Sequence, residues 1–336
     1  MNIHMDLQEN SYDILVESGI LSAASEHLNL KRRVLVVTDS GVPVSYAQTL
    51  AAQCATAVVY TVETGESSKS LEVLTKILQV LLEQNFSRKD CIVAVGGGVV
   101  GDLAGFAASI YMRGIDFYNI PTTVLSEVDS SIGGKTAIDF MGYKNIVGAF
   151  YPPMGVLIDP DTLQTLPKRQ IANGLAEVVK MAMISDPILF DILENEDIEE
   201  NIDTIIQRSL YIKKYVVEND EKETGLRKTL NFGHTLAHAI ESANHMETYY
   251  HGECVGIGMI PMCSPDVRDR LLAVLRKLNL PTETNYTAEQ LIDACRHDKK
   301  ASGDTITVVW VPEIGKAELQ TMSFTQYAAF VKGWLG

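Results

Sequence analysis

The amino-acid sequence predicts an α/β domain with a parallel sheet over residues 1–158, followed by a mostly α-helical domain over residues 159–336. In the first half of the chain, short continuous apolar runs alternate with helical patterns. Apolar strands separated by helices are typical of a parallel sheet that is covered on both faces. After about residue 160, helical patterns follow one another almost without a strand. We therefore expect a change of architecture near Pro160 and no flexible linker.

Five short apolar runs are expected to form the parallel strands of the first domain: residues 34–37, 57–60, 92–95, 117–120 and 156–158. Leucine and isoleucine recur at helical spacing over residues 71–82. Ser70 is expected to cap this helix, because a serine hydroxyl can accept from the first free backbone N–H groups. A further helix is expected over residues 102–109, directly after a glycine-rich turn.

The second half of the chain is expected to be helical except for one strand at residues 306–311. Its apolar residues recur at the spacing of helices over residues 171–184, 187–195, 199–218, 229–243, 265–278 and 287–296.

The charge balance narrows the class of protein. The chain has 336 residues, with 28 Lys and Arg against 43 Asp and Glu, and a formal net charge of −15. A nucleic-acid or anionic-membrane surface needs clustered positive charge, so we expect neither partner. No apolar run is long enough to span a bilayer, and the first ten residues do not resemble a signal peptide. The five cysteines are scattered without a CxxC pair, which disfavours a disulfide framework. A cytoplasmic protein is expected.

A glycine-rich turn marks a candidate phosphate-binding site. Gly96-Gly97-Gly98 follows a predicted strand and precedes a predicted helix. Glycines there let backbone N–H groups approach a phosphate, and a helix N-terminus favours negative charge. The pattern is not the GxGxxG fingerprint, and alone it is equally consistent with a tight turn that binds nothing. A second turn, Pro121-Thr122-Thr123, ends the next strand and favours a nucleotide bound to a Rossmann-like sheet.

Histidines and one acidic residue indicate a metal site. His234 and His238 are four residues apart on a predicted helix, and His251 follows shortly after. Glu177 lies with Lys180 on another, otherwise apolar helix. Three such groups with an open position are the ligands of catalytic zinc. These spacings alone do not choose which histidines bind. Each histidine taken singly is more simply read as part of the core or surface, whereas the cluster favours a metal site.

Several basic residues stand beside glycine or asparagine or within apolar segments, although the chain as a whole is acidic. A pocket that gathers them would suit a small polyanion such as a phosphorylated carboxylate. Each lysine taken singly is more simply read as solvated. The residues are Arg113, Lys135, Lys144, Lys180, Lys213, Arg227, Lys299 and Lys300.

Together these motifs closely resemble the 3-dehydroquinate synthase family, within the sugar-phosphate cyclase superfamily. Nine segments match in the expected order, from about residue 11 to the C-terminal region. They are GGGVVGDLAGF (96–106), YMRG (111–114), PTTVL (121–125), VDSSIGGKT (128–136), KN (144–145), GLAEVVK (174–180), LNFGHT (230–235), HGE (251–253) and DKK (298–300).

The resemblance implies a metal- and NAD-dependent enzyme of the shikimate pathway, which leads to chorismate and the aromatic amino acids. It would be a phosphate-eliminating carbon–oxygen lyase that converts 3-deoxy-D-arabino-heptulosonate 7-phosphate to 3-dehydroquinate and phosphate. The family oxidises one hydroxyl with NAD⁺, eliminates phosphate, reduces the ketone again and closes the ring by an intramolecular aldol reaction. NAD is regenerated in each turnover and acts as a catalyst.

The resemblance also implies roles for individual residues. The metal ligands would be Glu177, His234 and His251, with zinc as the metal and cobalt as a substitute. The NAD contacts would be Asp39, Gly65, Glu66, Lys69, Gly97, Gly98, Val99, Asp102, Thr122, Thr123, Leu125, Asp129, Ser130, Lys135, Lys144 and Thr162. The substrate contacts and catalytic groups would be Arg113, Asp129, Lys135, Asn145, Lys180, Lys213, Arg227, Asn231, His238 and one of Lys299 and Lys300. Arg113 would reach the phosphate in a neighbouring subunit, which implies a homodimer.

The chain departs from the family pattern in two places. Gly41 stands where the family usually has an asparagine, so one nucleotide hydrogen bond is expected to be lost. The segment after Glu253 is shorter than usual, and Pro261 and Pro265 are expected to interrupt a helix there.

Three other functions are consistent with parts of the pattern. Cyclases that make deoxy-inosose or valiolone products share the implied fold and metal site, but their substrates lack the carboxylate; Lys213, Arg227 and Asn231 favour dehydroquinate. A metal-dependent polyol or alcohol dehydrogenase has a similar plan but would release NADH. An inactive NAD- or metal-binding regulator would have no reason to retain every catalytic residue.

Overall fold

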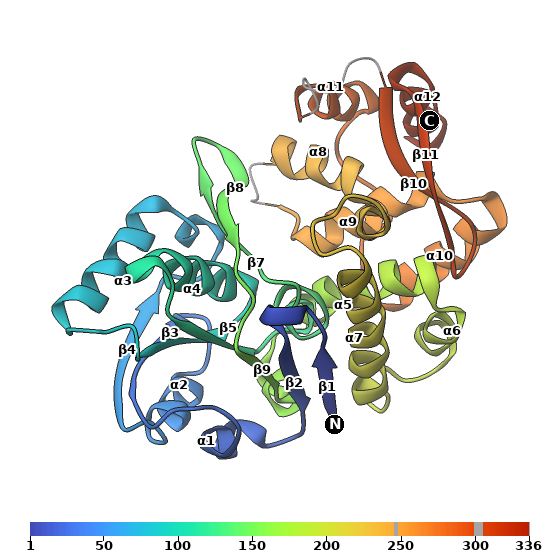
Figure 1. Ribbon diagram of the computed structural model, residues 1–336. Helices are drawn as coiled ribbons and strands as arrows, with labels where there is room; N and C mark the ends of the chain where they lie inside the picture. Colours follow the sequence, from blue (N-terminus) through green and yellow to red (C-terminus); the bar gives the residue numbers. More distant parts are fainter. Residues whose placement is uncertain (245–247, 299–304, 336) are drawn as a thin grey trace. The chain divides into compact units, whose positions relative to one another are not determined.

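The computed structural model describes residues 1–244, 248–298 and 305–335 (Figure 1). The chain forms two compact units, residues 1–166 and residues 167–336. In the described part of the chain, no helix has the length and apolar character needed to cross a membrane.

The N-terminal unit is built on a seven-stranded sheet with the order β1-β2-β9-β6-β5-β3-β4. All five predicted strands are confirmed, as β3 (Arg33–Asp39), β4 (Thr56–Val62), β5 (Cys91–Gly96), β6 (Asp116–Pro121) and β9 (Gly155–Ile158), and they pair in parallel. Two further strands, β1 (Asn2–Met5) and β2 (Tyr12–Val16), were not predicted; β1 is antiparallel to β2. The sheet is therefore mixed only at one edge.

Helices cover both faces of this sheet (Figure 1). Side chains alternate along a strand, so Leu35 and Ile92 pack on one face with α3 (Leu71–Glu83) and α4 (Gly98–Ile110). On the other face, Val36 packs with α1 (Ala24–His27), α2 (Val44–Ala51) and the 3-10 helix η2 (Ile20–Ala23).

The ends of two helices test the sequence expectations. Ser70 caps α3, since its hydroxyl accepts from the Val73 N–H at 3.4 Å. Helix α4 begins at Gly98, four residues before the expected start at Asp102. The glycine turn therefore comprises the last residue of β5, the N-cap Gly97 and the first residue of α4. Gly96 has no room for a side chain, because a Cβ there would lie 2.7 Å from Val100.

A separate hairpin, β7 (Lys135–Phe140) and β8 (Tyr143–Phe150), extends from the N-terminal unit and was not predicted. Six of the eight residues of β8, including Tyr143 to Ile146, are too exposed to give a run of buried apolar residues. The remaining short helical turns of this unit are η1 (Gln8–Asn10), η3 (Glu66–Ser68), η4 (Tyr111–Arg113), η5 (Ser126–Ser130) and η6 (Pro160–Thr165).

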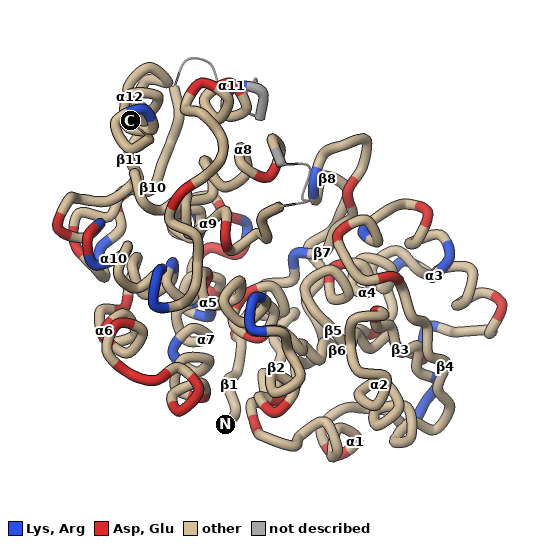
Figure 2. Tube along the Cα trace, turned by 180° about the vertical axis from the view of Figure 1, so that it is seen from behind, with Lys and Arg blue, Asp and Glu red and all other residues tan. Residues whose placement is uncertain are grey.

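The C-terminal unit is mostly helical, as predicted. Its helices are α5 (Lys168–Ser185), α6 (Pro187–Asn195), α7 (Ile202–Asn219), α8 (His234–Asn244), α9 (His251–Met259), α10 (Pro265–Lys277), α11 (Ala288–Asp298) and α12 (Phe324–Leu335), with the 3-10 turns η7 (Leu226–Asn231) and η8 (Ile260–Met262). The predicted strand is β10 (Thr305–Glu313), which pairs with β11 (Lys316–Ser323) in an antiparallel hairpin. Much of the acidic excess lies between α6 and α7 (Figure 2), at Glu194, Glu196, Asp197, Glu199, Glu200 and Asp203.

The helix expected over residues 229–243 is two elements. Helix η7 ends at Asn231 and α8 begins at His234. Between them Gly233 has φ +78°, a left-handed conformation that glycine adopts without strain. The break places His234 at the first position of a new helix.

The short connection after α9 behaves as the prolines predict. Helix α9 ends at Met259, η8 contains Pro261, and Pro265 occupies the first turn of α10. Helix α9 packs closely because it contains glycines: a Cβ at Gly258 would lie 2.1 Å from the Gly233 carbonyl oxygen.

This close approach gives a stability prediction. Gly258→Ala is expected to lower the free energy of unfolding by about 2–3 kcal/mol, because the backbone of Gly233 cannot yield like a flexible side chain. The matched control is Gly333→Ala in α12, where a Cβ meets nothing within 4 Å and the alanine is expected to stabilise by about 0.5–1 kcal/mol. Urea unfolding of the two variants measures the difference. Equal midpoints for both would contradict the packing described.

Candidate active site

Three potential metal ligands from three helices converge in the C-terminal unit. Glu177 lies in the middle of α5 and is 1% exposed, while His234 and His251 begin α8 and α9. Their ligand atoms all lie within 4.8 Å of one another. Glu177 Oε1 is 3.7 Å from His234 Nε2 and 3.4 Å from His251 Nε2. Among the described residues, this is the one group of three or more such side chains.

Both imidazoles are oriented by hydrogen bonds at the opposite ring nitrogen. His234 Nδ1 donates to the Phe232 carbonyl at 3.1 Å. His251 Nδ1 donates to Glu241 Oε1 at 3.0 Å, and Glu241 is buried. Each ring therefore presents Nε2 to Glu177. A metal-binding histidine is commonly held in this way by a carbonyl or carboxylate behind it.

The electrostatics of the three groups differ. Burial raises the pKa of Glu177, but Lys180 and the imidazoles outweigh burial and hold that pKa well below its usual value. Burial lowers the pKa of His234 to about 3, and the carboxylate of Glu177 offsets only part of this shift. Burial also lowers the pKa of His251, but the nearby carboxylates of Glu177 and Glu241 override it and raise the pKa to about 10.

These residues fit a divalent metal. Both carboxylate oxygens of Glu177 are buried, and neither accepts a geometrically sound hydrogen bond from the described residues. Lys180 and the two imidazoles nevertheless lie within ion-pair range. One carboxylate and two imidazoles are a known donor set of catalytic zinc. His238 is not in this group: it is exposed and lies edge-on to His234, with ring centroids 5.7 Å apart.

One stripe of α5 holds His251 close to Glu177. Arg169, Asn173 and Glu177 are spaced by four residues and so lie on one helix face. Arg169 forms a two-point ion pair with Glu253 at 2.7 and 2.8 Å. Asn173 Oδ1 accepts from the Gly252 N–H at 2.7 Å. The two contacts fix the first turn of α9 against the helix that carries Glu177.

Three cations predicted to bind substrate are buried in the same unit. Lys180 is 2%, Lys213 6% and Arg227 2% exposed. Burying a charge is costly unless it is paired. Lys180 contacts Glu177, and Arg227 Nη1 donates to the Glu221 carbonyl at 2.6 Å. The predicted Asn231 is exposed and bonds Glu223, while Lys299 and Lys300 lie outside the described residues.

The carboxyl ends of β3 and β5 form the candidate nucleotide site of the N-terminal unit. The chain passes from β4 back across β3 to β5, and in open α/β sheets ligands bind where the strand order changes direction. A Cβ at Gly97 would lie 3.2 Å from Thr123, and one at Gly98 would lie 2.9 Å from Ser130 Oγ. Ser130 Oγ is buried without a hydrogen-bond partner in the described residues. At the start of α4, Gly97 and Gly98 expose their backbone without side chains, and the Ser130 hydroxyl beside them is free to bond a ligand. These features fit a phosphate-bearing ligand.

A buried ion network joins predicted NAD contacts to a predicted substrate contact. Lys69 Nζ donates to Asp102 at 2.8 Å and to the side-chain oxygen of Asn145, and it lies 3.6 Å from Glu66. Burial raises the pKa of Asp102 to about 6, although Lys69 opposes the shift. Asn145 has φ +53° and is held by Asp139, which accepts from its N–H at 2.8 Å.

Gly41 closes the turn after β3. Its N–H donates to Asp39 Oδ1 at 2.7 Å. A Cβ at Gly41 would lie 2.9 Å from Thr64 Oγ1. The glycine that departs from the family pattern is therefore suited to this tight turn.

The other predicted site residues of the N-terminal unit lie on its loops and short turns. Thr162 is buried in η6 and donates to Glu127 at 3.2 Å. Arg113 is exposed, with φ +69° directly after Met112 at φ +50°. Gly65 has φ +108° and precedes η3. Thr122 and Leu125 follow β6, and Val99 is in the first turn of α4. Asp129 is in η5. Lys135 and Lys144 are on the β7–β8 hairpin.

Glu241, which orients His251, is not among the residues predicted from the sequence. A signal was available, because Glu241 is seven residues after His234 and therefore on the same face of α8. An acidic residue on a helix is too common for that spacing alone to identify it.

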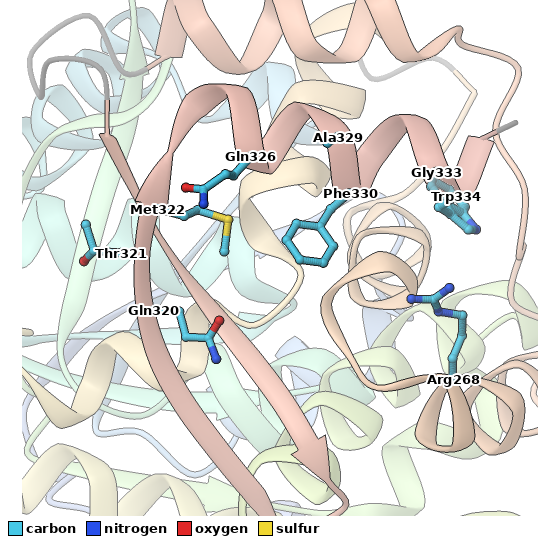
Figure 3. A pocket seen from close by; sticks show the side chains of 9 residues that line it. All are labelled: Arg268, Gln320, Thr321, Met322, Gln326, Ala329, Phe330, Gly333 and Trp334. Carbon is cyan, nitrogen blue, oxygen red and sulfur yellow. The ribbon is translucent and has the colours of Figure 1, made fainter.

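A cavity of about 750 Å³ in the C-terminal unit is separate from the metal ligands (Figure 3). It lies between α10, β11 and α12 and is lined by side chains such as Met322, Phe330 and Trp334. Arg268 also lines it, but its guanidinium donates to the carbonyls of Ile260 and Cys263. None of the predicted site residues lines this cavity.

Family models match residues 59–301, and curated relatives match nearly the whole chain. The family models described as 3-dehydroquinate synthase N-terminal and C-terminal match residues 59–173 and 174–301. The 3-dehydroquinate synthase of Streptococcus thermophilus (strain ATCC BAA-491 / LMD-9) is 40% identical over 354 residues, covering 99% of this chain and 100% of the relative. That of Streptococcus mutans serotype c is 39% identical with the same coverage.

Solved structures show the same fold. A 2-deoxy-scyllo-inosose synthase complexed with carbaglucose-6-phosphate, NAD⁺ and Co²⁺ has a TM-score of 0.87 and 25% identity, with 100% of both chains covered. The 2-epi-5-epi-valiolone synthase of Streptomyces hygroscopicus with NAD⁺ and Zn²⁺ has a TM-score of 0.87 and 28% identity, with 98% of both chains covered. Glycerol dehydrogenase from Schizosaccharomyces pombe has a TM-score of 0.64 and 16% identity over 96% of this chain and 88% of its own, a likeness of fold alone.

The charge state of His251 gives a prediction for metal binding. With a pKa raised to about 10, His251 is protonated at pH 7.5 and must lose that proton to bind a metal. Zinc binding is expected to release about one proton, and the zinc affinity is expected to rise about tenfold per pH unit between pH 7 and the pKa of His251. Calorimetry in buffers of different ionisation enthalpy measures the proton count. His251→Ala is the control that should lose tight binding, and binding without proton release would contradict the assignment.

Proposed function

Because this chain belongs to the 3-dehydroquinate synthase family, we propose that it converts 3-deoxy-D-arabino-heptulosonate 7-phosphate to 3-dehydroquinate and phosphate, as a carbon–oxygen lyase. The observation that carries the proposal is that Lys180, Lys213 and Arg227 are all buried in the unit that also holds the Glu177, His234 and His251 group. A substrate with a phosphate and a carboxylate needs such desolvated cations in a chain of net charge −15.

The cations serve the chemistry as well as binding. Elimination of phosphate develops negative charge in the transition state, and preorganised cations in a water-poor site stabilise it. Lys180, Lys213, Arg227 and Asn231 bind the anionic groups of the substrate. His238, which is exposed beside His234, hydrogen-bonds or transfers a proton at the substrate. Lys135, Asn145 and one of Lys299 and Lys300 complete the proposed contacts.

Glu177, His234 and His251 hold one divalent metal, zinc in the first instance, with cobalt as a substitute. When bound, the metal polarises a substrate hydroxyl and NAD accepts and returns a hydride. Lys180 keeps Glu177 ionised, and the Phe232 carbonyl and Glu241 keep both Nε2 atoms aimed at the ligand position. These residues therefore prepare the site before the metal arrives.

NAD binds at the carboxyl ends of β3 and β5. Gly97 and Gly98 offer backbone N–H groups at the start of α4, where a pyrophosphate is favoured. Ser130 supplies its unpartnered hydroxyl. Asp102 is held by Lys69, which also holds Asn145. Cofactor and substrate contacts within this unit are thereby linked through one buried ammonium.

The enzyme is a cytoplasmic homodimer in this proposal, and Arg113 serves the phosphate site of the second subunit. Met112 and Arg113 are consecutive non-glycine residues with positive φ, and the arginine side chain is exposed. Such strain persists only where the surroundings impose it and is concentrated at functional positions.

A second candidate is another sugar-phosphate cyclase, because two such enzymes share the fold at a TM-score of 0.87. Their identities of 25% and 28% are lower than the 40% shared with a 3-dehydroquinate synthase. The substrate carboxylate distinguishes the two candidates.

The test is phosphate release from the heptulosonate 7-phosphate with zinc, with and without NAD⁺. We expect release that requires NAD⁺ and leaves no net NADH. Arg227→Ala is expected to lower kcat/KM roughly a hundredfold or more, because a buried charged contact is lost. Arg208→Ala, which removes a guanidinium paired with Asp186 on the same unit, is the matched control and should retain turnover.

Three outcomes would contradict the proposal. Equal turnover of a sugar phosphate without a carboxylate would indicate another cyclase. NADH accumulating with a polyol would indicate a dehydrogenase. Turnover by Arg227→Ala at the wild-type rate would refute the assigned carboxylate contact.

A further inference from the structure

The chain between α7 and η7 folds around the carboxylate of Asp220. Asp220 Oδ1 accepts from the Thr224 N–H at 2.8 Å and from Thr224 Oγ1 at 3.0 Å. Asp220 Oδ2 accepts from the N–H groups of Gly225 at 2.7 Å and Arg227 at 2.9 Å. Four hydrogen bonds to one side chain therefore fix the backbone of residues 224–227 against the end of α7.

Arg227 depends on this turn at both its backbone and its side chain. Its N–H is one of the four donors to Asp220. Its Nη1 donates to the carbonyl of Glu221, which lies in the same turn, at 2.6 Å. The guanidinium is therefore aimed by the turn, and a change in the turn must move it.

Asn231 is connected to the same turn through Glu223. Asn231 Nδ2 donates to Glu223 Oε1 at 2.7 Å. Glu223 has φ +59°, a left-handed conformation that is unfavourable for a residue with a side chain. Its N–H donates to the Asp220 carbonyl at 3.3 Å. Arg227 and Asn231, the two η7 residues assigned to the substrate, are therefore both hydrogen-bonded to the turn that folds around Asp220.

The charge of Asp220 is directed at backbone dipoles. Desolvation raises the pKa of Asp220, but hydrogen bonds from Gly225, Thr224 and Arg227 outweigh it, so the pKa lies well below its usual value. The carboxylate of Asp220 is therefore ionised at neutral pH and accepts hydrogen bonds from the turn with both oxygens. A carboxylate that accepts several backbone N–H groups stabilises a turn in the same way that a bound anion stabilises a loop whose N–H groups converge on it.

We propose that Asp220 is a positioning residue that shapes the turn aiming Arg227 at the carboxylate of the substrate. The inference rests on the proposed function, because it takes Arg227 as the carboxylate contact. Asp220 acts through Arg227, since its four side-chain hydrogen bonds above are all made with the turn. It consequently contributes to discrimination between sugar phosphates that carry a carboxylate and those that do not.

The test variant is Asp220→Asn. The amide has the same shape, but its NH₂ group would face backbone N–H donors, so the turn must open. We expect KM for the heptulosonate 7-phosphate to rise roughly tenfold to a hundredfold, the effect of a displacement of about 1 Å in a binding group. Zinc affinity is expected to match wild type, because the four hydrogen bonds of the Asp220 side chain are made with the turn and not with the metal ligands.

Two ligands that cannot complete the reaction separate a positioning role from general damage to the site. One is the phosphonate analogue of the heptulosonate, which carries the carboxylate and cannot lose phosphate. The other is carbaglucose 6-phosphate, which has no carboxylate. Calorimetry of the variant loaded with zinc and NAD⁺ is expected to show at least tenfold weaker binding of the first and less than twofold change for the second. Equal weakening of both, or no weakening of either, would overturn the positioning role.

Asp90→Asn is the matched control. Asp90 also accepts two backbone N–H groups, from Ser87 at 2.7 Å and Arg33 at 3.2 Å, and the Ser87 hydroxyl at 2.8 Å, but none of the site residues belongs to its turn. It should bind both ligands as wild type does. If wild type releases no phosphate from the heptulosonate, the proposed function fails. If wild type turns over and Asp220→Asn matches it, the positioning inference alone fails.

Discussion

The C-terminal unit depends on one buried carboxylate that must remain charged. Glu177 lies inside α5 at 1% exposure, where burial opposes ionisation. Its charge persists because Lys180 is on the same helix and because α8 and α9 each begin with a histidine aimed at it. Bringing α9 so close requires Gly252, where a Cβ would lie 1.9 Å from the Asn173 carbonyl oxygen. The helix packing and the metal site are therefore consequences of one constraint.

The chain combines an acidic overall composition with a few buried cations, and the two features together select the kind of anion that can bind. A net charge of −15 disfavours polyanionic surfaces as partners, yet Lys180, Lys213 and Arg227 are buried and Lys69 is 3% exposed. Acidic side chains hold Lys69 and Lys180 in fixed places, and the Glu221 carbonyl oxygen holds Arg227. A site of this kind attracts a small anion by local geometry, while the rest of the surface repels large ones.

The elements of the fold could be predicted wherever the sequence shows a continuous apolar run or a clear helical spacing of apolar residues. The strands β3 to β6 and β9 are continuous apolar runs, whereas β8 is mostly exposed and carries no comparable signal. Helix α9 was missed because its glycines lower helix propensity, although they are what allows it to pack. In the site, residue spacing proposed Glu177 and three histidines, and the family resemblance selected two of these. Glu241 and Asp220 act through hydrogen bonds that form only after folding, so no local pattern is specific enough to identify them.

The most direct test of this account is X-ray absorption at the zinc edge of the protein loaded with one equivalent of zinc. The account predicts two imidazole nitrogens and one carboxylate oxygen in the first shell at about 2.0–2.2 Å, and the loss of one imidazole contribution in His251→Ala. A sulfur scatterer at about 2.3 Å, or an unchanged spectrum in His251→Ala, would contradict the proposed metal centre.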